Sequence, residues 1–316
     1  MPECHWRRQV YAYHKVIGWW HIPSLRARIP LGGTFHRLET NSFGMRASRD
    51  YPREAPAGRG RIVFLGDSYT AGDGVSNGQR FTDLLEARHP QLDALNFGLN
   101  GSGTDQQLLI FETLARGFAA DAYVWCICVE NIARNLYSCF PSFDIREQQL
   151  IYRPKPYFDL TETGLVLRNQ PVPLERRSHD ALGDWRYRFP YIEGSSDTYA
   201  IYNYPERIHW RTMRAIIERL IAQIGGRPLL IVPLPMYNHY LEESPPTYWP
   251  RFLELQDPKA NVFVVDLMPT FRRVPHADRE ALRFGDDPHY TAPAHALVAN
   301  ALEVAFSEHC PKLLAR

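Results

Sequence analysis

Two residues far apart in the chain, Ser68 and His289, have the types and neighbours that nucleophilic catalysis requires. Ser68 and Asp67 directly follow the apolar run RIVFLG, so a strand ending there would present the serine hydroxyl at its carboxyl end. A serine hydroxyl becomes a nucleophile only where a base takes its proton. The two residues therefore predict a hydrolytic Ser–His site, although a structural Gly-Asp-Ser turn or a helix cap would also explain the serine.

An acidic residue close before His289 would complete such a site. Asp286 and Asp287 stand three and two residues ahead of the histidine. A carboxylate at either position can accept the Nδ1–H bond, which fixes the tautomer and leaves Nε2 free to take the serine proton. The residues alone leave both acids open.

Acyl transfer also needs fixed donors for the oxyanion that forms on the substrate. The backbone amides of Ser68 and Gly101 and the side-chain amide of Asn131 are of the right type, and each follows a predicted strand. Taken singly each is a weak signal, because asparagine and glycine are common turn formers. Tyr69 and Asn100, their neighbours in the chain, are candidates for contact with the substrate.

Strands and helices alternate along most of the chain after residue 58, which predicts a parallel sheet covered on both faces. Ligands of such sheets bind beyond the carboxyl ends of the strands, where the candidate residues would meet. We expect a three-layer αβα sandwich of the flavodoxin type. The predicted strands cover 61–66, 92–97, 122–129, 228–235 and 262–267, and the predicted helices begin near residues 81, 104, 206 and 291.

Two regions break this alternation. Residues 1–57 show no clean period and predict an arm or cap that packs on the domain of residues 58–316. Residues 141–205 form an aromatic-rich insertion, too long for an α/β connection. Its Trp185 and Tyr187 are candidates for a substrate wall or lid. A small satellite core under a long loop is an equally good interpretation.

Composition narrows the class of protein. A formal net charge of +1 gives no reason to expect a nucleic-acid partner. The five scattered cysteines do not resemble a disulfide framework, and Cys126 and Cys128 favour structural filling of a strand over a metal site. The first residues lack the apolar core of a secretory signal, and no run approaches the length of a membrane span. We therefore expect a cytoplasmic protein without a nucleic-acid partner or a membrane span, and the oligomeric state stays open.

Four segments together resemble the conserved blocks of the SGNH/GDSL hydrolases, in the order of that family. RIVFLGDSYTAGDGV resembles the block of the nucleophile, NFGLNGSGT the block of the oxyanion glycine, VENIARN the block of the oxyanion asparagine, and DDPHYTAPAHALVANAL the block of the catalytic histidine. The resemblance covers most of 58–135 and 262–306. It departs at Glu130-Asn131-Ile132, where the family usually has Gly-Asn-Asp.

The resemblance implies a serine esterase with Ser68 as nucleophile and His289 as base, without metal or cofactor. Because the family more often spaces its acid three residues before the histidine, the resemblance ranks Asp286 first and keeps Asp287 close behind. The implied substrates are short acyl esters of a sugar, a lipid or a small metabolite. An acyltransferase with the same residues, and a binding protein that kept only the fold, remain as alternatives.

Overall fold

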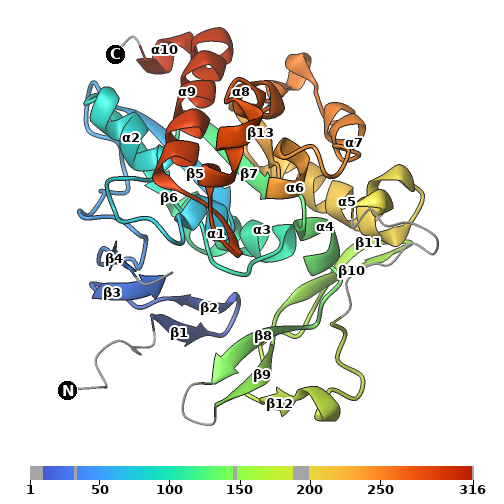
Figure 1. Cartoon of the computed structure of the whole chain (residues 1–316). Coiled ribbons are helices and arrows are strands. Elements are labelled where there is room, and N and C mark those ends of the chain that lie inside the picture. The colour runs from blue at the N-terminus through green and yellow to red at the C-terminus, as the bar shows by residue number, and fades with distance from the viewer. Residues whose placement is uncertain (1–9, 32–33, 145–147, 188–198, 315–316) are drawn as a thin grey trace.

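A five-stranded parallel sheet forms the core of the molecule (Figure 1). The computed structural model describes residues 10–31, 34–144, 148–187 and 199–314. The sheet has the order β14-β13-β7-β5-β6. Its central strands are buried along their whole length, which explains their largely apolar sequences. In chain order the strands are β5 (Gly60–Gly66), β6 (Leu92–Asn96), β7 (Ala122–Cys128), β13 (Leu229–Leu234) and β14 (Val262–Val264).

Helices cover both faces of this sheet. Helices α2 (Phe81–Arg88) and α9 (Ala292–His309) pack together on one face, and α3 (Thr104–Thr113) and α5 (Ile208–Gln223) pack together on the other (Figure 1). Numbered along the chain, the five strands lie in the order 2-1-3-4-5, which is the flavodoxin-like order. The expected three-layer α/β fold is confirmed.

Shorter elements connect these layers. The short helices are α1 (Ser68–Ala71), α4 (Asn131–Arg134), α6 (Tyr237–Tyr240), α7 (Trp249–Leu253), α8 (Met268–Arg272) and α10 (Pro311–Leu314). The 3₁₀ helices are η1 (Ala115–Gly117), η2 (His179–Ala181), η3 (Ala200–Asn203), η4 (Pro258–Ala260) and η5 (His276–Leu282). A small antiparallel hairpin, β15 (Arg283–Phe284) and β16 (Asp287–Tyr290), precedes α9.

The start of α3 differs in detail from what its sequence suggests. Thr104 and Gln107 have the spacing of a capping box, but Gly103 is the N-cap. Asn135 supplies the cap from outside the helix, because its Oδ1 accepts bonds from the Thr104 hydroxyl at 2.8 Å and from the Asp105 amide at 3.1 Å. The Gln107 side chain does not cap the helix and instead bonds to Asn131.

The N-terminal segment folds into two antiparallel hairpins beside the carboxyl end of the sheet (Figure 1). The first joins β1 (Tyr11–His14) to β2 (Gly18–His21), and the second joins β3 (Arg26–Leu31) to β4 (Thr34–Glu39). Ile17 and Trp20 are buried in the main core. The Gln106 side chain on α3 donates to the Ile17 carbonyl at 2.8 Å, so the first hairpin is anchored to the domain.

The segment after α4 carries a three-stranded antiparallel sheet and a hairpin. The sheet comprises β8 (Cys139–Asp144), β9 (Gln149–Pro154) and β12 (Arg177–Ser178). The hairpin comprises β10 (Tyr157–Thr161) and β11 (Gly164–Arg168), and its turn lies in the sequence TETG of residues 161–164. A fully buried ion pair between Lys155 and Asp105 ties this segment to α3.

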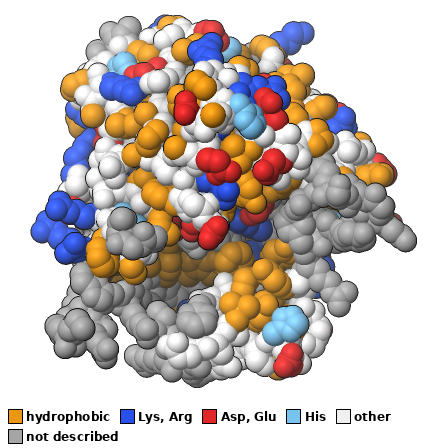
Figure 2. Space-filling view, in the orientation of Figure 1, with side chains coloured by type: hydrophobic (Ala, Val, Ile, Leu, Met, Phe, Trp, Pro, Cys, Tyr) orange, Lys and Arg blue, Asp and Glu red, His pale blue; other side chains and the backbone are white. Residues whose placement is uncertain are grey.

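The three-stranded sheet and the β10–β11 hairpin together are named the lower lobe. Figure 2 shows a recess between the main body and the lower lobe, with hydrophobic side chains along it. It lies in the area where Figure 1 places β2 and β8. Within the described ranges, no helix is both long and apolar enough to cross a membrane.

Candidate active site

Ser68 stands at the junction of β5 and α1. A side chain at Gly66 would lie 2.0 Å from the Thr70 hydroxyl and 2.7 Å from the Cys126 carbonyl, so the tight exit from β5 requires glycine. Asp67 is the N-cap of α1 and accepts the Tyr69 amide at 3.1 Å. The sharp turn places the Ser68 hydroxyl beyond the carboxyl end of the sheet, as the sequence predicts.

His289 reaches Ser68 across 221 positions of sequence. Its Nε2 lies 2.7 Å from the Ser68 Oγ, and its Nδ1 lies 2.6 Å from Oδ1 of Asp287. The backbone amide of His289 donates to the same carboxylate oxygen at 2.9 Å. The three side chains thus form one hydrogen-bonded line in which the imidazole is oriented from behind and faces the hydroxyl.

Of the two acids left open by the sequence, Asp287 makes the contact with the histidine. Asp287 and His289 both lie in β16, where residues two apart point to the same face of the strand. Asp286 lies in the turn between β15 and β16, after Gly285 with its positive φ of 54°. The sequence ranked Asp286 first, whereas the structure places Asp287 against the histidine. Asp286 lies three positions before His289, and residues three apart in a strand point to opposite faces, so that spacing suits a backbone other than a strand.

The pKa of His289 reflects its neighbours. Burial lowers it, but the hydrogen bond to Asp287 and the negative charges of Asp73 and Asp67 outweigh burial and raise the pKa above its ordinary value. For Asp287, burial favours the neutral form, yet the bond to His289 and the charge of the imidazole hold the pKa of its carboxyl below the usual range. Both shifts stabilise the imidazolium beside the carboxylate, which is the form that follows proton transfer from the serine.

The backbone amides of Ser68 and Gly101 are candidate donors to an oxyanion. Gly101 has a φ of 72°, in the left-handed region, and a side chain there would meet the Phe140 ring at 2.6 Å. Within the part of the chain that the structure describes, the amides of Ser68 and Gly101 donate no hydrogen bond. Both donors are thus available to a substrate.

Asn131, the third candidate donor, is buried at the start of α4 and belongs to a hydrogen-bonded chain. Its Oδ1 accepts from Nε2 of Gln107 at 2.9 Å, and Oε1 of Gln107 accepts from the Trp125 indole at 2.6 Å. Its Nδ2 donates to Oδ2 of Asp67 at 3.0 Å. An asparagine amide carries two N–H groups, so one remains beyond the bond to Asp67.

Arg134 bonds to the same Asp67 carboxylate and so extends this network of hydrogen bonds. Its guanidinium donates to Oδ2 of Asp67 at 3.0 Å and to Oε2 of Glu130 at 2.7 Å. Burial raises the pKa of Asp67, and the Arg134 charge and the Asn131 bond act against that rise. The sequence alone did not assign Gln107 or Arg134 to this site, because their roles depend on contacts between separate elements.

Tyr69 and Asn100, the two candidates for substrate contact next to the site, have different surroundings. Tyr69 is buried, its hydroxyl donates to the Pro288 carbonyl at 2.9 Å, and its ring packs against His289 with 5.0 Å between centroids. These contacts favour support of the histidine loop over direct contact with a substrate. Asn100 borders a cleft, where its side chain donates to Asp73 and its carbonyl accepts the Trp19 indole N–H at 3.0 Å.

The two candidates from the insertion lie elsewhere. Tyr187 packs against the rings of Tyr137 and Tyr152 at 4.8 and 5.1 Å, and the Arg177 guanidinium lies over the Trp185 ring at 4.2 Å. These contacts are those of a satellite core, the alternative that the sequence left open. The aromatic residues that approach the candidate oxyanion loop are Trp19 and Phe140 instead, whose ring centroids lie 5.7 Å apart.

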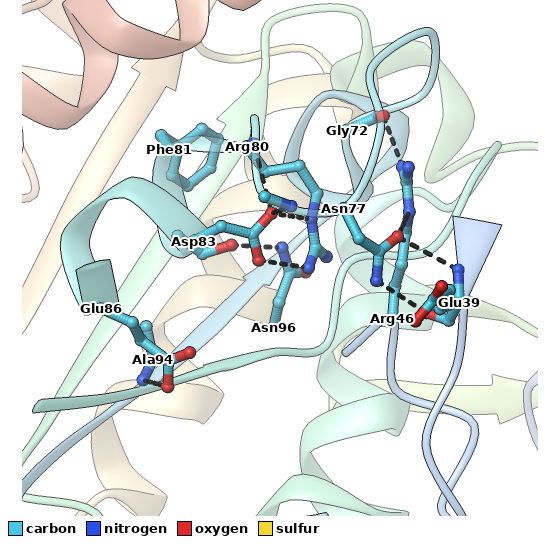
Figure 3. Close-up of polar contacts among 12 residues, drawn as sticks. Glu39, Arg46, Gly72, Asn77, Arg80, Phe81, Asp83, Glu86, Ala94 and Asn96 are labelled. Atoms are coloured by element: carbon cyan, nitrogen blue, oxygen red, sulfur yellow. Dashed lines mark hydrogen bonds and ion pairs between the residues drawn. The ribbon is translucent and has the colours of Figure 1, made fainter. Parts of the chain in front are cut away.

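A buried arginine from the N-terminal segment fixes the loop that follows α1 (Figure 3). Arg46 donates to the carbonyls of Ala71, Gly72 and Val75, and its Nε donates to Asn77 at 3.0 Å. Burial and the nearby Arg80 lower its pKa to about 10, so it remains charged at neutral pH. Without this group, the carbonyls of Ala71 and Val75, in the loop that follows Ser68, would lose a buried donor.

The described residues contain no group of three or more histidine, cysteine, aspartate or glutamate side chains arranged to hold a metal ion. Cys126 and Cys128 are buried free thiols in β7.

Residues 62–152 match the model of the GDSL-like lipase/acylhydrolase family, and this stretch contains Ser68 and the candidate oxyanion residues. This part of the chain is similar to the SGNH/GDSL hydrolases, the family that its sequence motifs resemble. The match favours hydrolysis as the class of chemistry. A search of curated proteins gave no match.

Several solved structures of GDSL-type proteins are similar to this chain. A lipolytic G-D-S-L family protein from Veillonella parvula is 14% identical, over 78% of this chain and 98% of that one, with a TM-score of 0.44. A lipase/acylhydrolase from Enterococcus faecalis is 16% identical, over 78% and 95%, with a TM-score of 0.44. A catalytic mutant of an acetylxylan esterase from Geobacillus stearothermophilus is 11% identical, over 78% and 94%, with a TM-score of 0.46.

Proposed function

We propose that this protein is a serine esterase that hydrolyses short acyl esters through an acyl-enzyme on Ser68. The observation that carries the proposal is the hydrogen-bonded line from Ser68 through His289 to Asp287, with contacts of 2.7 and 2.6 Å. A serine with this partner is activated as its proton passes to the imidazole.

In the first step Ser68 Oγ attacks the ester carbonyl while its proton passes to Nε2 of His289. The amides of Ser68 and Gly101, with the free N–H of Asn131, stabilise the oxyanion. The intermediate collapses, the bond to the alcohol breaks, and the imidazolium returns its proton to the leaving alkoxide. Water then attacks the acyl-enzyme with His289 again as the base, which releases the acid and restores the serine.

Hydrolysis of a panel of p-nitrophenyl esters, from acetate to decanoate, tests this function. We expect the wild type to cleave the shortest esters best, and Ser68→Ala to lose turnover while its thermal unfolding stays close to that of the wild type. Turnover retained by Ser68→Ala would overturn the proposal. Product analysis in the presence of added alcohols separates a hydrolase from a transferase, because a transferase would form a new ester instead of the free acid.

A further inference from the structure

A cleft of about 200 Å³ opens directly beside the candidate oxyanion loop. It lies between the first N-terminal hairpin and the three-stranded sheet of the lower lobe, in the area of the recess in Figure 2. We name it the arm cleft. Its lining residues include Tyr11, Tyr13, Trp19, Asn100, Phe140 and Arg176.

The arm cleft adjoins the candidate oxyanion loop. Asn100 lines it and is the chain neighbour of Gly101, whose Cα faces the Phe140 ring of the cleft wall. Asn100 is also held by Asp73, whose amide donates to the Ser68 carbonyl at 3.0 Å. A substrate with its carbonyl at Gly101 would therefore extend its remaining part along this wall.

The walls of the arm cleft are tied to each other and to the domain. The Tyr13 hydroxyl donates to the Val172 carbonyl at 2.7 Å, and the Val172 amide donates to the Lys15 carbonyl at 2.8 Å. The Trp19 indole is fixed on Asn100 at 3.0 Å. Such bonds between the two walls preform the cleft, which lowers the entropy that a ligand loses on binding.

The chemistry of the lining indicates the class of ligand. The lining combines aromatic and proline surfaces (Tyr13, Trp19, Phe140, Pro141 and Pro154) with the charged residues Arg153, Glu175 and Arg176. An acyl chain would bury charged groups against methylenes at a free-energy cost. A polyanion would meet the carboxylate of Glu175. A sugar ring has an apolar face for the aromatic rings and hydroxyl groups for the charged side chains.

We infer that the arm cleft binds the saccharide alcohol of an acylated sugar, with the ester carbonyl at Gly101 and Ser68. This inference rests on the proposed function and extends it, because it names the leaving group and assigns its site to the N-terminal hairpin and the lower lobe. Tyr13 is the exposed ring of the cleft, 47% accessible, and so is the residue best placed to stack on a sugar.

The test compares acetylated trisaccharides with p-nitrophenyl acetate. The probes are acetylated trisaccharides of glucose, xylose and N-acetylglucosamine, and the readout is the ratio of their kcat/KM to that of p-nitrophenyl acetate. We expect Tyr13→Ala to lower this ratio about tenfold for at least one trisaccharide, as loss of an aromatic contact does. Tyr13→Phe keeps the ring and should retain most of the ratio. Phe43→Ala removes a partly exposed ring outside the cleft and should leave the ratio unchanged.

Two results would overturn the inference. In one, Tyr13→Ala leaves the kcat/KM ratio unchanged for every trisaccharide ester. In the other, Tyr13→Ala impairs cleavage of p-nitrophenyl octanoate, which would make the arm cleft an acyl pocket. Calorimetric binding of the deacetylated trisaccharides to Ser68→Ala, with and without Tyr13→Ala, measures the same site without turnover. Failure of the proposed function is distinct, since the wild type would then cleave neither class of ester.

Discussion

The carboxylate of Asp287 lies 2.6 Å from Nδ1 of His289, on the same face of a single short strand. The strand alternation that brings these two side chains together also turns Asp286 away into the preceding hairpin turn. The contact between Asp287 and His289 is therefore set by the backbone of a four-residue strand.

Substitution of the two acids separates their roles. We expect Asp287→Asn to lower kcat by about a thousandfold or more, because an amide at this position favours the wrong imidazole tautomer. Asp286→Asn, at the neighbouring position and with the same change of charge, should alter kcat by less than about threefold. Steady-state kinetics with p-nitrophenyl acetate measures both. A large loss in Asp286→Asn with a small loss in Asp287→Asn would refute the assignment.

The pH dependence of kcat/KM reports the protonation of His289. The base must be neutral to accept the serine proton, and its pKa is raised. Activity should therefore rise with pH through a midpoint above the ordinary histidine value of about 6.5. Removal of the Asp287 charge removes one cause of the rise, so the residual activity of Asp287→Asn should have its midpoint at lower pH. A midpoint that moves upward in this variant would contradict the electrostatic account.

Arg134 acts on the site through Asp67 and Asn131, and a double-mutant cycle tests this. We expect Asn131→Ala to lower kcat about a hundredfold, as expected for one oxyanion donor, and Arg134→Ala to lower kcat about tenfold. The double variant should resemble Asn131→Ala alone, because Arg134 has no amide left to position. Arg134→Lys should recover part of the loss. Fully additive losses would show instead that Arg134 acts independently of Asn131.

Arg46 should matter for stability more than its distance from the catalytic side chains suggests. Arg46→Ala leaves buried carbonyls of the loop after α1 without donors, which we expect to cost about 3 kcal/mol in the free energy of unfolding. Arg88→Ala, a change to a partly exposed arginine on α2, should cost less than about 1 kcal/mol. Urea denaturation measures both. Equal losses for the two variants would mean that the loop does not depend on Arg46.

The sequence allowed the main sheet and the Ser68 and His289 positions to be predicted because both depend on local signals. Apolar runs that end at glycine mark the buried strands, and the candidate donors follow those runs directly. The choice between Asp286 and Asp287 depends on whether DDPH forms a turn or a strand. Residue types do not decide that choice, since both acids are chemically suitable.

Other parts of the site were not predictable, because they depend on contacts between segments whose sequences show no regular hydrophobic period. Trp19 comes from the N-terminal hairpin and Phe140 from β8, yet both border the loop of Asn100 and Gly101. Gln107 has the spacing of a capping residue and instead binds Asn131 across two elements. Such contacts follow from tertiary packing, which overrides the local pattern.

The most direct test of the account is to label the protein with a fluorophosphonate and locate the adduct by peptide mass spectrometry. Fluorophosphonates react with a serine that a neighbouring base activates. The account predicts a single adduct on Ser68 in the wild type, no adduct in Ser68→Ala, and much slower labelling in Asp287→Asn. An adduct on a different serine, or ester turnover by a protein that resists labelling, would contradict the assignment of Ser68 as the nucleophile.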